Sequence, residues 1–175
     1  MADADIEVLL AERAIKEVLH RYARGVDRYD LDLVSTCYWA DATDDHGTYQ
    51  GTVAGFVEDI RTRLLRFERT MHVLANCLIE TDLAHDRARA ETYCLAFHRF
   101  ADGADAGGSP GPADLTAALR YVDRFERRDG EWRIADRVLA YEWARLDPVG
   151  PERLLGRRFA RGTRDGTDPL HRWEP

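Results

Sequence analysis

The sequence lacks the motifs of nucleophile-, metal- and nucleotide-dependent enzymes. It contains no phosphate-binding glycine loop, no serine nucleophile elbow and no H-E-x-x-H zinc motif. Its three cysteines, Cys37, Cys77 and Cys94, are odd in number and lack metal-type spacing, which is typical of buried free thiols in a reducing cytoplasm. We therefore expect no cofactor, no metal site and no serine or cysteine nucleophile.

Long apolar runs are also absent. No stretch approaches the ~20 residues that cross a bilayer, and the acidic start, MADADIEVLL, is not a signal peptide. The formal net charge of −7 disfavours nucleic acid or an anionic membrane as the main partner. We expect a cytoplasmic protein that binds a small molecule. An Arg-rich tail is the local exception, interpreted as an exposed or subunit-contacting segment: Arg153, Arg157, Arg158, Arg161 and Arg164.

Helical spacing of apolar residues appears first. It predicts a helix over 6–26, which Gly25 and the polar segment after it bring to an end. Shorter helices are expected at 31–38 and 53–67. The residues between these two, 41–51, are rich in turn formers, with a short strand near Gly47-Gln50.

After this region the period changes to two. Residues that favour β-structure fill four strand candidates: 70–81, 87–100, 117–128 and 131–145. Asp129-Gly130 between the last two is a strong hairpin signal. The Gly- and Pro-rich connector 101–114 predicts a long, mobile hairpin loop that covers a cavity as a lid.

Helices followed by long strands predict an α+β fold. We expect a single domain over 1–175, in which 146–175 is a C-terminal extension. The predicted architecture is a cone-shaped, curved antiparallel sheet packed on the N-terminal helices, an α+β barrel. A cavity between sheet and helices is then the expected place for a small molecule.

Strand alternation places two histidines on faces that can meet a ligand. His72 shares its predicted face with Leu74, Asn76 and Leu78. His98 shares its face with small residues: Ala90, Thr92, Cys94 and Ala96. Small residues leave room for a ligand or for a packed helix, so each histidine is either a structural group or a site residue.

Asp27 raises a different question, because it closes an amphipathic run. It lies five positions after Tyr22, about 140° round an ideal helix, so an inward Asp27 requires the helix to end or bend near Gly25. Two interpretations stay open: a helix-end or N-cap carboxylate, or half of a catalytic pair. Tyr22 is either core or site residue. The acidic segment around His46 suggests a metal site as a hypothesis, but the spacing of its residues matches no standard metal motif.

Several segments together resemble the SnoaL-like branch of the nuclear-transport-factor-2-like superfamily. AIKEVLHRYARGVD, GTYQG, TMHVLAN and FERRDGEWRIADR are similar to hexachlorocyclohexane dehydrochlorinase, over roughly residues 10–140. Scytalone dehydratase and bile-acid 7α-dehydratase are also similar, and the latter shares a tyrosine five residues before its aspartate. The dehydrochlorinase has a lysine at that position, which favours an oxygen leaving group or a carbonyl substrate here.

The resemblance implies roles for particular residues. Asp27 and His72 match a catalytic dyad in which the histidine is the base. Tyr22 and Arg137 fall on positions that stabilise developing negative charge in the same pocket. Four residues are expected to bind substrate: His98, Trp39, Tyr49 and Tyr121.

A cofactor-independent lyase of the dehydratase type is the implied function. Its His-Asp dyad abstracts a C–H proton from a small cyclic, polyketide, aromatic or steroid-like substrate. Two alternatives stay open: an isomerase or polyketide cyclase with the same base, and a non-catalytic small-molecule-binding or subunit-assembly module. The relatives also imply a homo-oligomer, either a dimer or a trimer.

Overall fold

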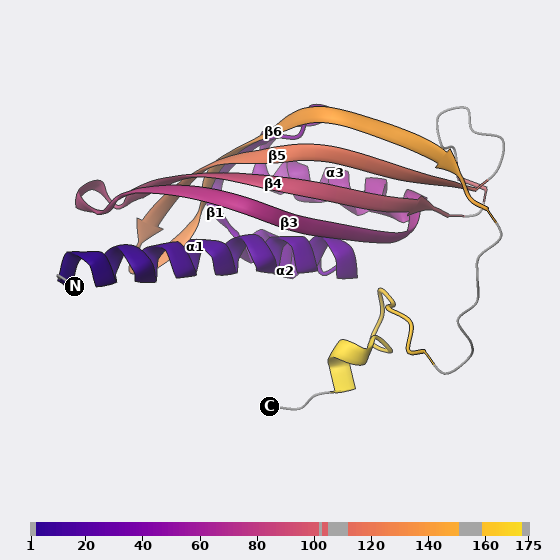
Figure 1. The fold of residues 1–175 in the computed structure, drawn as a ribbon, viewed down its shortest axis with the longest axis horizontal. Helices are drawn as coiled ribbons and strands as arrows, with labels where there is room; N and C mark the ends of the chain where they lie inside the picture. Colours follow the sequence, from indigo (N-terminus) through magenta and orange to yellow (C-terminus); the bar gives the residue numbers. More distant parts are fainter. Residues whose placement is uncertain (1–2, 102, 105–111, 151–158, 173–175) are drawn as a thin grey trace.

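The computed structural model describes residues 3–101, 103–104, 112–150 and 159–172. Its helices are α1 (Asp3–Arg28), α2 (Leu31–Thr36) and α3 (Val53–Arg63), with 3₁₀ segments η1 (Leu64–Arg66), η2 (Leu83–His85) and η3 (Pro169–Arg172). Its strands are β1 (Tyr38–Asp45), β2 (Gln50–Thr52), β3 (Phe67–Asp82), β4 (Arg87–Phe100), β5 (Ala113–Arg128) and β6 (Glu131–Pro148). The predicted α+β class is confirmed, because N-terminal helices lie against one long, curved sheet (Figure 1).

The six strands form one sheet in the order β2-β1-β6-β5-β4-β3. β3, β4, β5 and β6 are antiparallel neighbours, as predicted. β1 runs parallel to β6, so the sheet is mixed rather than wholly antiparallel. Within the described residues β2 and β3 are the two edges, so the sheet is curved but does not close into a barrel. α1 lies along the edge strand β3 (Figure 1).

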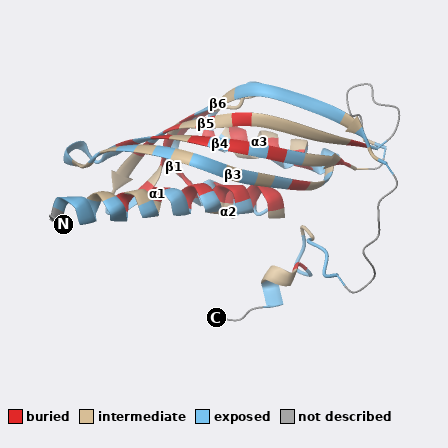
Figure 2. Ribbon diagram, in the orientation of Figure 1, coloured by how far each residue is buried: buried red, intermediate tan, exposed pale blue. Residues whose placement is uncertain are grey.

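The core lies between α1 and the inner face of the sheet. Ile15, Val18, Leu19 and Tyr22 of α1 are at most 2% exposed. They belong to one buried cluster with inward residues of the strands, and Figure 2 shows the buried positions gathered along this contact. The amphipathic spacing of α1 therefore decides which side of the helix meets the sheet.

β1 and β2 lie where mainly turns were predicted. A turn over residues 46–49 joins them, and β2 pairs with β1. β1 contains three Asp residues, and Asp is depleted in strands. The backbone of β1 is nevertheless paired on both sides, by β2 and β6. Tertiary pairing thus outweighs local propensity in this segment.

A β-bulge changes the face pattern of β3. Between Leu74 and Cys77, β3 contains one residue more than the paired part of β4. The inner face therefore passes from Leu74 to Cys77, and Leu78 is 64% exposed. The prediction that Asn76 and Leu78 share the face of His72 is wrong for this reason. The predicted face of His98 is confirmed, because its small residues are all buried.

The turns agree with the sequence where the structure describes them. Asp129 and Gly130 join β5 to β6 with φ values of 51° and 83°, as an Asp-Gly hairpin turn requires. Residues 102 and 105–111 of the predicted mobile connector lie outside the described residues, as do Arg153, Arg157 and Arg158 of the tail. Across the described ranges, every helix is too short or too polar to cross a membrane.

Candidate active site

Asp27 lies in the last turn of α1, which runs without interruption through Gly25 to Arg28. The helix thus ends near Gly25, as an inward Asp27 was predicted to require, although Asp27 itself is still helical. The buried side of α1 is wide, so Tyr22 turns toward the interior of the sheet while Asp27 turns toward the edge of β3. Asp27 is not the N-cap of α2, because Asp30 has that role.

His72 meets Asp27 at the open edge of the sheet. β3 is an edge strand, and the backbone N–H of His72 donates to Asp27 Oδ2 at 2.9 Å rather than to another strand. The ring Nδ1 lies 2.7 Å from Asp27 Oδ1, within the hydrogen-bond reach expected from the sequence. The hydroxyl of Thr70 donates to the same Oδ1 at 2.9 Å. One carboxylate thus holds both the backbone and the ring of His72.

These contacts determine the charge on Asp27. Burial raises the pKa of the Asp27 carboxyl, but the hydrogen bonds and charge of His72 and the hydroxyl of Thr70 outweigh burial, so the pKa lies below its usual value. An ionised carboxylate only accepts hydrogen bonds, so the proton on the His72 ring is held at Nδ1. Within the described part of the chain no hydrogen-bond partner occupies Nε2.

His98 lies beside His72 on the inner face of the sheet. It pairs with Thr70 and not with His72, and the two histidine rings meet edge to face with centroids 5.3 Å apart. Burial, together with the smaller effect of the charge of His72, lowers the pKa of His98 to about 3, so this ring is neutral near pH 7. Its buried Nδ1 has no hydrogen-bond partner among the residues described. His98 can therefore offer a neutral ring nitrogen to a ligand.

A groove of about 970 Å³ adjoins the two histidines: His98 lines it, whereas His72 does not, although its partner Asp27 does. Asp27, Thr70 and His98 line it, as do the ends of β3, β4, β5 and β6. Residues 159–164 of the C-terminal segment form the facing wall. The groove lies at one end of the sheet, beside the C-terminal turn of α1, and its volume suits a small molecule.

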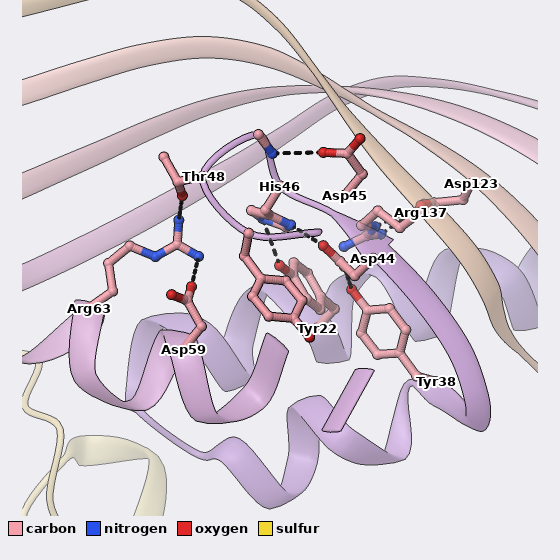
Figure 3. A network of polar contacts seen from close by, with 12 residues as sticks. Tyr22, Tyr38, Asp44, Asp45, His46, Thr48, Asp59, Arg63, Asp123 and Arg137 are labelled. Carbon is pink, nitrogen blue, oxygen red and sulfur yellow. Dashed lines mark hydrogen bonds and ion pairs between the residues drawn. The ribbon is translucent and has the colours of Figure 1, made fainter. Parts of the chain in front are cut away.

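A second polar cluster lies on α1, β1, β5 and β6 (Figure 3). His46 Nδ1 is 2.6 Å from Asp44 Oδ1, and the Tyr22 hydroxyl is 3.5 Å from His46 Nε2. Burial lowers the pKa of His46 despite the opposing effect of Asp44, and burial raises the pKa of Tyr22. Both side chains are therefore neutral near pH 7. Tyr22 is buried, and the His46 side chain is 11% exposed.

Arg137 belongs to this second cluster. Its Nε and Nη2 donate to Asp123 at 2.6 and 2.8 Å. The side chains of Arg137, Asp123 and Tyr22 are all buried. The guanidinium lies between the rings of Tyr22 and Tyr121, 4.2 and 4.1 Å from their centroids. Asp123 and the two rings hold the guanidinium in place, while Arg137 Nη1 is buried without a hydrogen-bond partner among the described residues.

The registers separate Arg137 from the dyad. The row of Arg137 crosses β4 at Ala90, whereas the row of His72 crosses it at Ala96. These positions are about 20 Å apart at the usual rise of a strand. The structure therefore does not bring Tyr22 and Arg137 into contact with His72, although the resemblance implied one shared pocket.

The aromatic candidates also lie away from the dyad. Trp39 stacks between Arg128 and Arg133 at the tip of the β5–β6 hairpin, while the groove lies at the opposite ends of these strands. The Tyr49 hydroxyl donates to the carbonyl of Thr52, and its ring packs on Phe56. Tyr121 is buried with its ring against the guanidinium of Arg137. Of the four predicted substrate contacts, only His98 lines the groove.

Sequence patterns did not single out Thr70, Arg164, Asp44 or Asp123. Thr70 and Asp44 precede a candidate histidine by two residues, so strand alternation places each on the same face as that histidine. Arg164 carries no local signal, because its contacts are with residues about a hundred positions earlier. Within the described residues, no three His, Cys, Asp or Glu side chains gather as a metal site.

Known protein structures share this fold. Solved structures with a similar fold include a scytalone dehydratase-like protein from Novosphingobium aromaticivorans DSM 12444, with TM-score 0.69, 20% identity, and coverage of 91% of this chain and 100% of that chain. Hexachlorocyclohexane dehydrochlorinase LinA-type3 from Novosphingobium barchaimii LL02 has TM-score 0.68 and 19% identity, with coverage of 84% and 99%. Kfla4162 from Kribbella flavida has TM-score 0.66 and 20% identity, with coverage of 77% and 92%. At these identities the likeness shows the fold alone.

The sequence itself carries the family assignment. A search of curated proteins found no match. The SnoaL-like domain family matches residues 7–138, which is most of the chain, and this agrees with the resemblance that the sequence motifs predicted. The protein therefore belongs to the SnoaL-like domain family.

Proposed function

We propose that this protein is a cofactor-independent lyase of the dehydratase type, with His72 as its base. The observation that carries the proposal is the Asp27–His72 contact of 2.7 Å beside a groove of about 970 Å³. A neutral histidine whose Nδ1–H is held by a carboxylate presents a lone pair on Nε2. Family membership and the dehydratase and dehydrochlorinase folds among its structural neighbours support the same reaction class.

In the proposed reaction, His72 Nε2 removes a proton from a substrate carbon. The electron pair of that C–H bond forms a C=C bond as the hydroxyl on the neighbouring carbon departs. The imidazolium returns the proton to the departing hydroxyl, so water leaves and the enzyme is regenerated. Asp27 stays ionised throughout and stabilises the transient positive charge on His72.

His98 is the proposed polar contact for the substrate. Its ring stays neutral because burial lowers its pKa to about 3, and a neutral ring can donate one hydrogen bond to a substrate carbonyl without a competing charge. Apolar Phe97 and Leu115 line the same groove. A small cyclic hydroxyketone, with one apolar face and one carbonyl, fits this combination.

The same base supports an isomerase or a polyketide cyclase, in which the proton is moved without loss of water. Product mass separates these reactions, because only a dehydration releases water. A set of hydroxylated cyclic ketones incubated with the protein and followed by mass spectrometry therefore tests the reaction class directly.

Replacing the two dyad residues tests their roles. His72→Ala removes the base, and we expect turnover to fall by roughly 10²–10⁴-fold. Asp27→Asn leaves the imidazole without its charge partner and should lose much of the rate. The double variant should lose little more than His72→Ala alone, because the two residues act as one unit.

His85→Ala is the matched control, since His85 is an exposed histidine that also contacts an aspartate, Asp82. It should keep the wild-type rate. Full activity of His72→Ala would exclude His72 as the base. A double variant that shows the product of the two single losses would exclude the shared unit.

A further inference from the structure

The C-terminal segment, residues 159–172, lies outside the SnoaL-like match and docks against the end of α1. Arg28 Nη1 donates to the carbonyl of Thr163 at 3.4 Å, and Arg28 Nε lies 3.8 Å from Asp168. The N–H of Thr163 donates to Asp168 at 2.8 Å, which closes the turn of this segment. The docking places the next residue, Arg164, beside the dyad.

Arg164 binds the start of β3 through several donors. Its Nη1 donates to the carbonyls of Leu64 and Phe67 at 2.9 and 2.8 Å, where η1 passes into the strand. Its Nη2 donates to the Thr70 hydroxyl at 3.0 Å. The guanidinium is planar and presents these donors in a fixed fork, so a lysine cannot make the same set of bonds. Arg164 is thus half-buried against β3, whereas the tail was expected to be exposed or to contact a subunit.

The bond from Arg164 decides the direction of the Thr70 hydroxyl. A hydroxyl has one proton and two acceptor lone pairs. Because Arg164 is always a donor, it occupies a lone pair of Thr70 Oγ1, and the single proton is left for Asp27 Oδ1 at 2.9 Å. Asp27 Oδ1 in turn holds His72 Nδ1 at 2.7 Å. Four groups therefore form one directed chain from the C-terminal segment to the dyad.

We propose that Arg164 is a positioning residue, which acts through Thr70 to hold the Asp27 carboxylate against His72. Docking of the C-terminal segment is thereby coupled to the geometry of the dyad. This inference rests on the proposed function only for its catalytic consequence, since the hydrogen-bond chain exists independently of any substrate.

Other charged and titratable groups lie near the chain. His98 of β4 faces His72, and Glu68 and Arg69 flank Thr70 in β3 and line the groove. Arg28 at the end of α1, Tyr29 just after it and Arg63 of α3 act electrostatically on Arg164 or on His98. Arg161 lines the same groove as Arg164 but is exposed and has no hydrogen-bond or ion-pair partner among the described residues. Arg161 is therefore a matched control for a loss of positive charge.

Amide hydrogen exchange of the full-length protein tests the hydrogen-bond chain from Arg164 to His72, and it needs no substrate. The His72 amide is bonded to Asp27, so its exchange rate reports where the carboxylate sits. Arg164→Met and Thr70→Val should each speed this exchange, by about tenfold, as expected for the loss of one hydrogen bond to a charged group. Both should also raise the pKa of Asp27, measured by carbon NMR of its carboxyl. Arg161→Met should change neither quantity, and Arg164→Lys should recover only part of the wild-type behaviour.

The double variant separates a relay from a simple charge effect. If Arg164 acts through Thr70, adding Arg164→Met to Thr70→Val should change His72 exchange and the Asp27 pKa little further. Additive effects would overturn the relay, as would wild-type values in both single variants. Should Arg164→Met fail to fold, Thr70→Val still decides whether the hydroxyl holds Asp27. A loss of activity in His72→Ala has no bearing on these readouts, so the two proposals fail separately.

Discussion

At the scale of single residues, the site depends on which side chains are neutral and which are charged. Asp27 is held ionised by three hydrogen bonds, while burial keeps His98 neutral. The two histidines lie side by side, yet only His72 has a carboxylate partner. This difference assigns the proposed base to His72 and a hydrogen-bonding role to His98.

The neutral state of His98 predicts an acid-sensitive fold. Its folded pKa of about 3 lies below the usual value of 6.5, so the unfolded chain takes up the proton first. The resulting loss of stability is absent above about pH 6.5 and grows as the pH falls toward about 3, with a slope of up to about 1.4 kcal/mol per pH unit. We measure the free energy of unfolding in urea at several pH values between these limits. It should fall less steeply with decreasing pH in His98→Gln than in the wild type.

His85→Gln provides the comparison, because His85 is an exposed histidine. Its unfolding free energy should keep the wild-type dependence on pH. Equal slopes for the wild type and His98→Gln would mean that His98 is already protonated in the folded protein.

At the scale of elements, the site depends on an edge strand that lies beside a helix end. β3 has a strand partner on one side only, and α1 supplies Asp27 to the free N–H of His72 on the other. The connection from α1 to α2 is short, and Gly25 allows the two helices to approach closely: a Cβ at Gly25 would lie 2.8 Å from Val34 Cγ2. The position of Asp27 thus relies on a tight helix–helix contact.

Gly25→Ala tests this contact. Alanine favours a helix over glycine, but here the added methyl group meets Val34 and the Asp30 carbonyl, so we expect a net loss of about 1–3 kcal/mol in unfolding free energy. Gly150→Ala, where a Cβ would meet nothing within 4 Å, should be close to neutral. Thermal and urea unfolding measure both. A more stable Gly25→Ala protein would show that α2 moves freely away from α1.

At the scale of the whole molecule, the outer face of the sheet carries an exposed apolar row. Cross-strand pairs place Val73, Leu95, Ala118 and Trp143 in one row on this face. Leu95 is 40% exposed and Trp143 is 51% exposed. Contiguous apolar surface of this kind is unusual on monomeric proteins, and two copies can bury it by a self-complementary twofold contact.

We therefore expect the protein to self-associate through this face. Leu95→Glu should shift the mass in solution, measured by size-exclusion chromatography with light scattering, toward that of the monomer. Leu65→Glu is the control, because Leu65 is a leucine that is 66% exposed on η1, outside the sheet. A monomeric wild-type protein, or an oligomer that persists in Leu95→Glu, would contradict the expectation.

Much of the architecture follows from local patterns in the sequence. Helical spacing predicted α1, period-two segments predicted β3 to β6, and Asp129-Gly130 predicted their last turn. β1 escaped prediction, because its Asp residues favour turns, and only pairing with β2 and β6 holds this segment as a strand. The bulge in β3 likewise reversed the predicted faces beyond Leu74, because one inserted residue changes the side of every residue after it.

The sequence by itself determined most of the elements, the class of fold and, through its motifs, the family and the pairing of Asp27 with His72. Only the tertiary structure decided that Arg137 is held by Asp123 in a separate cluster and that Arg164 reaches Thr70. The physical reason lies in the range of the interactions. Spacing along the chain determines which face a side chain occupies within its own element. Strand register, an unpaired edge and the path of the C-terminal segment determine which distant faces meet, and these follow from the packing of the whole chain.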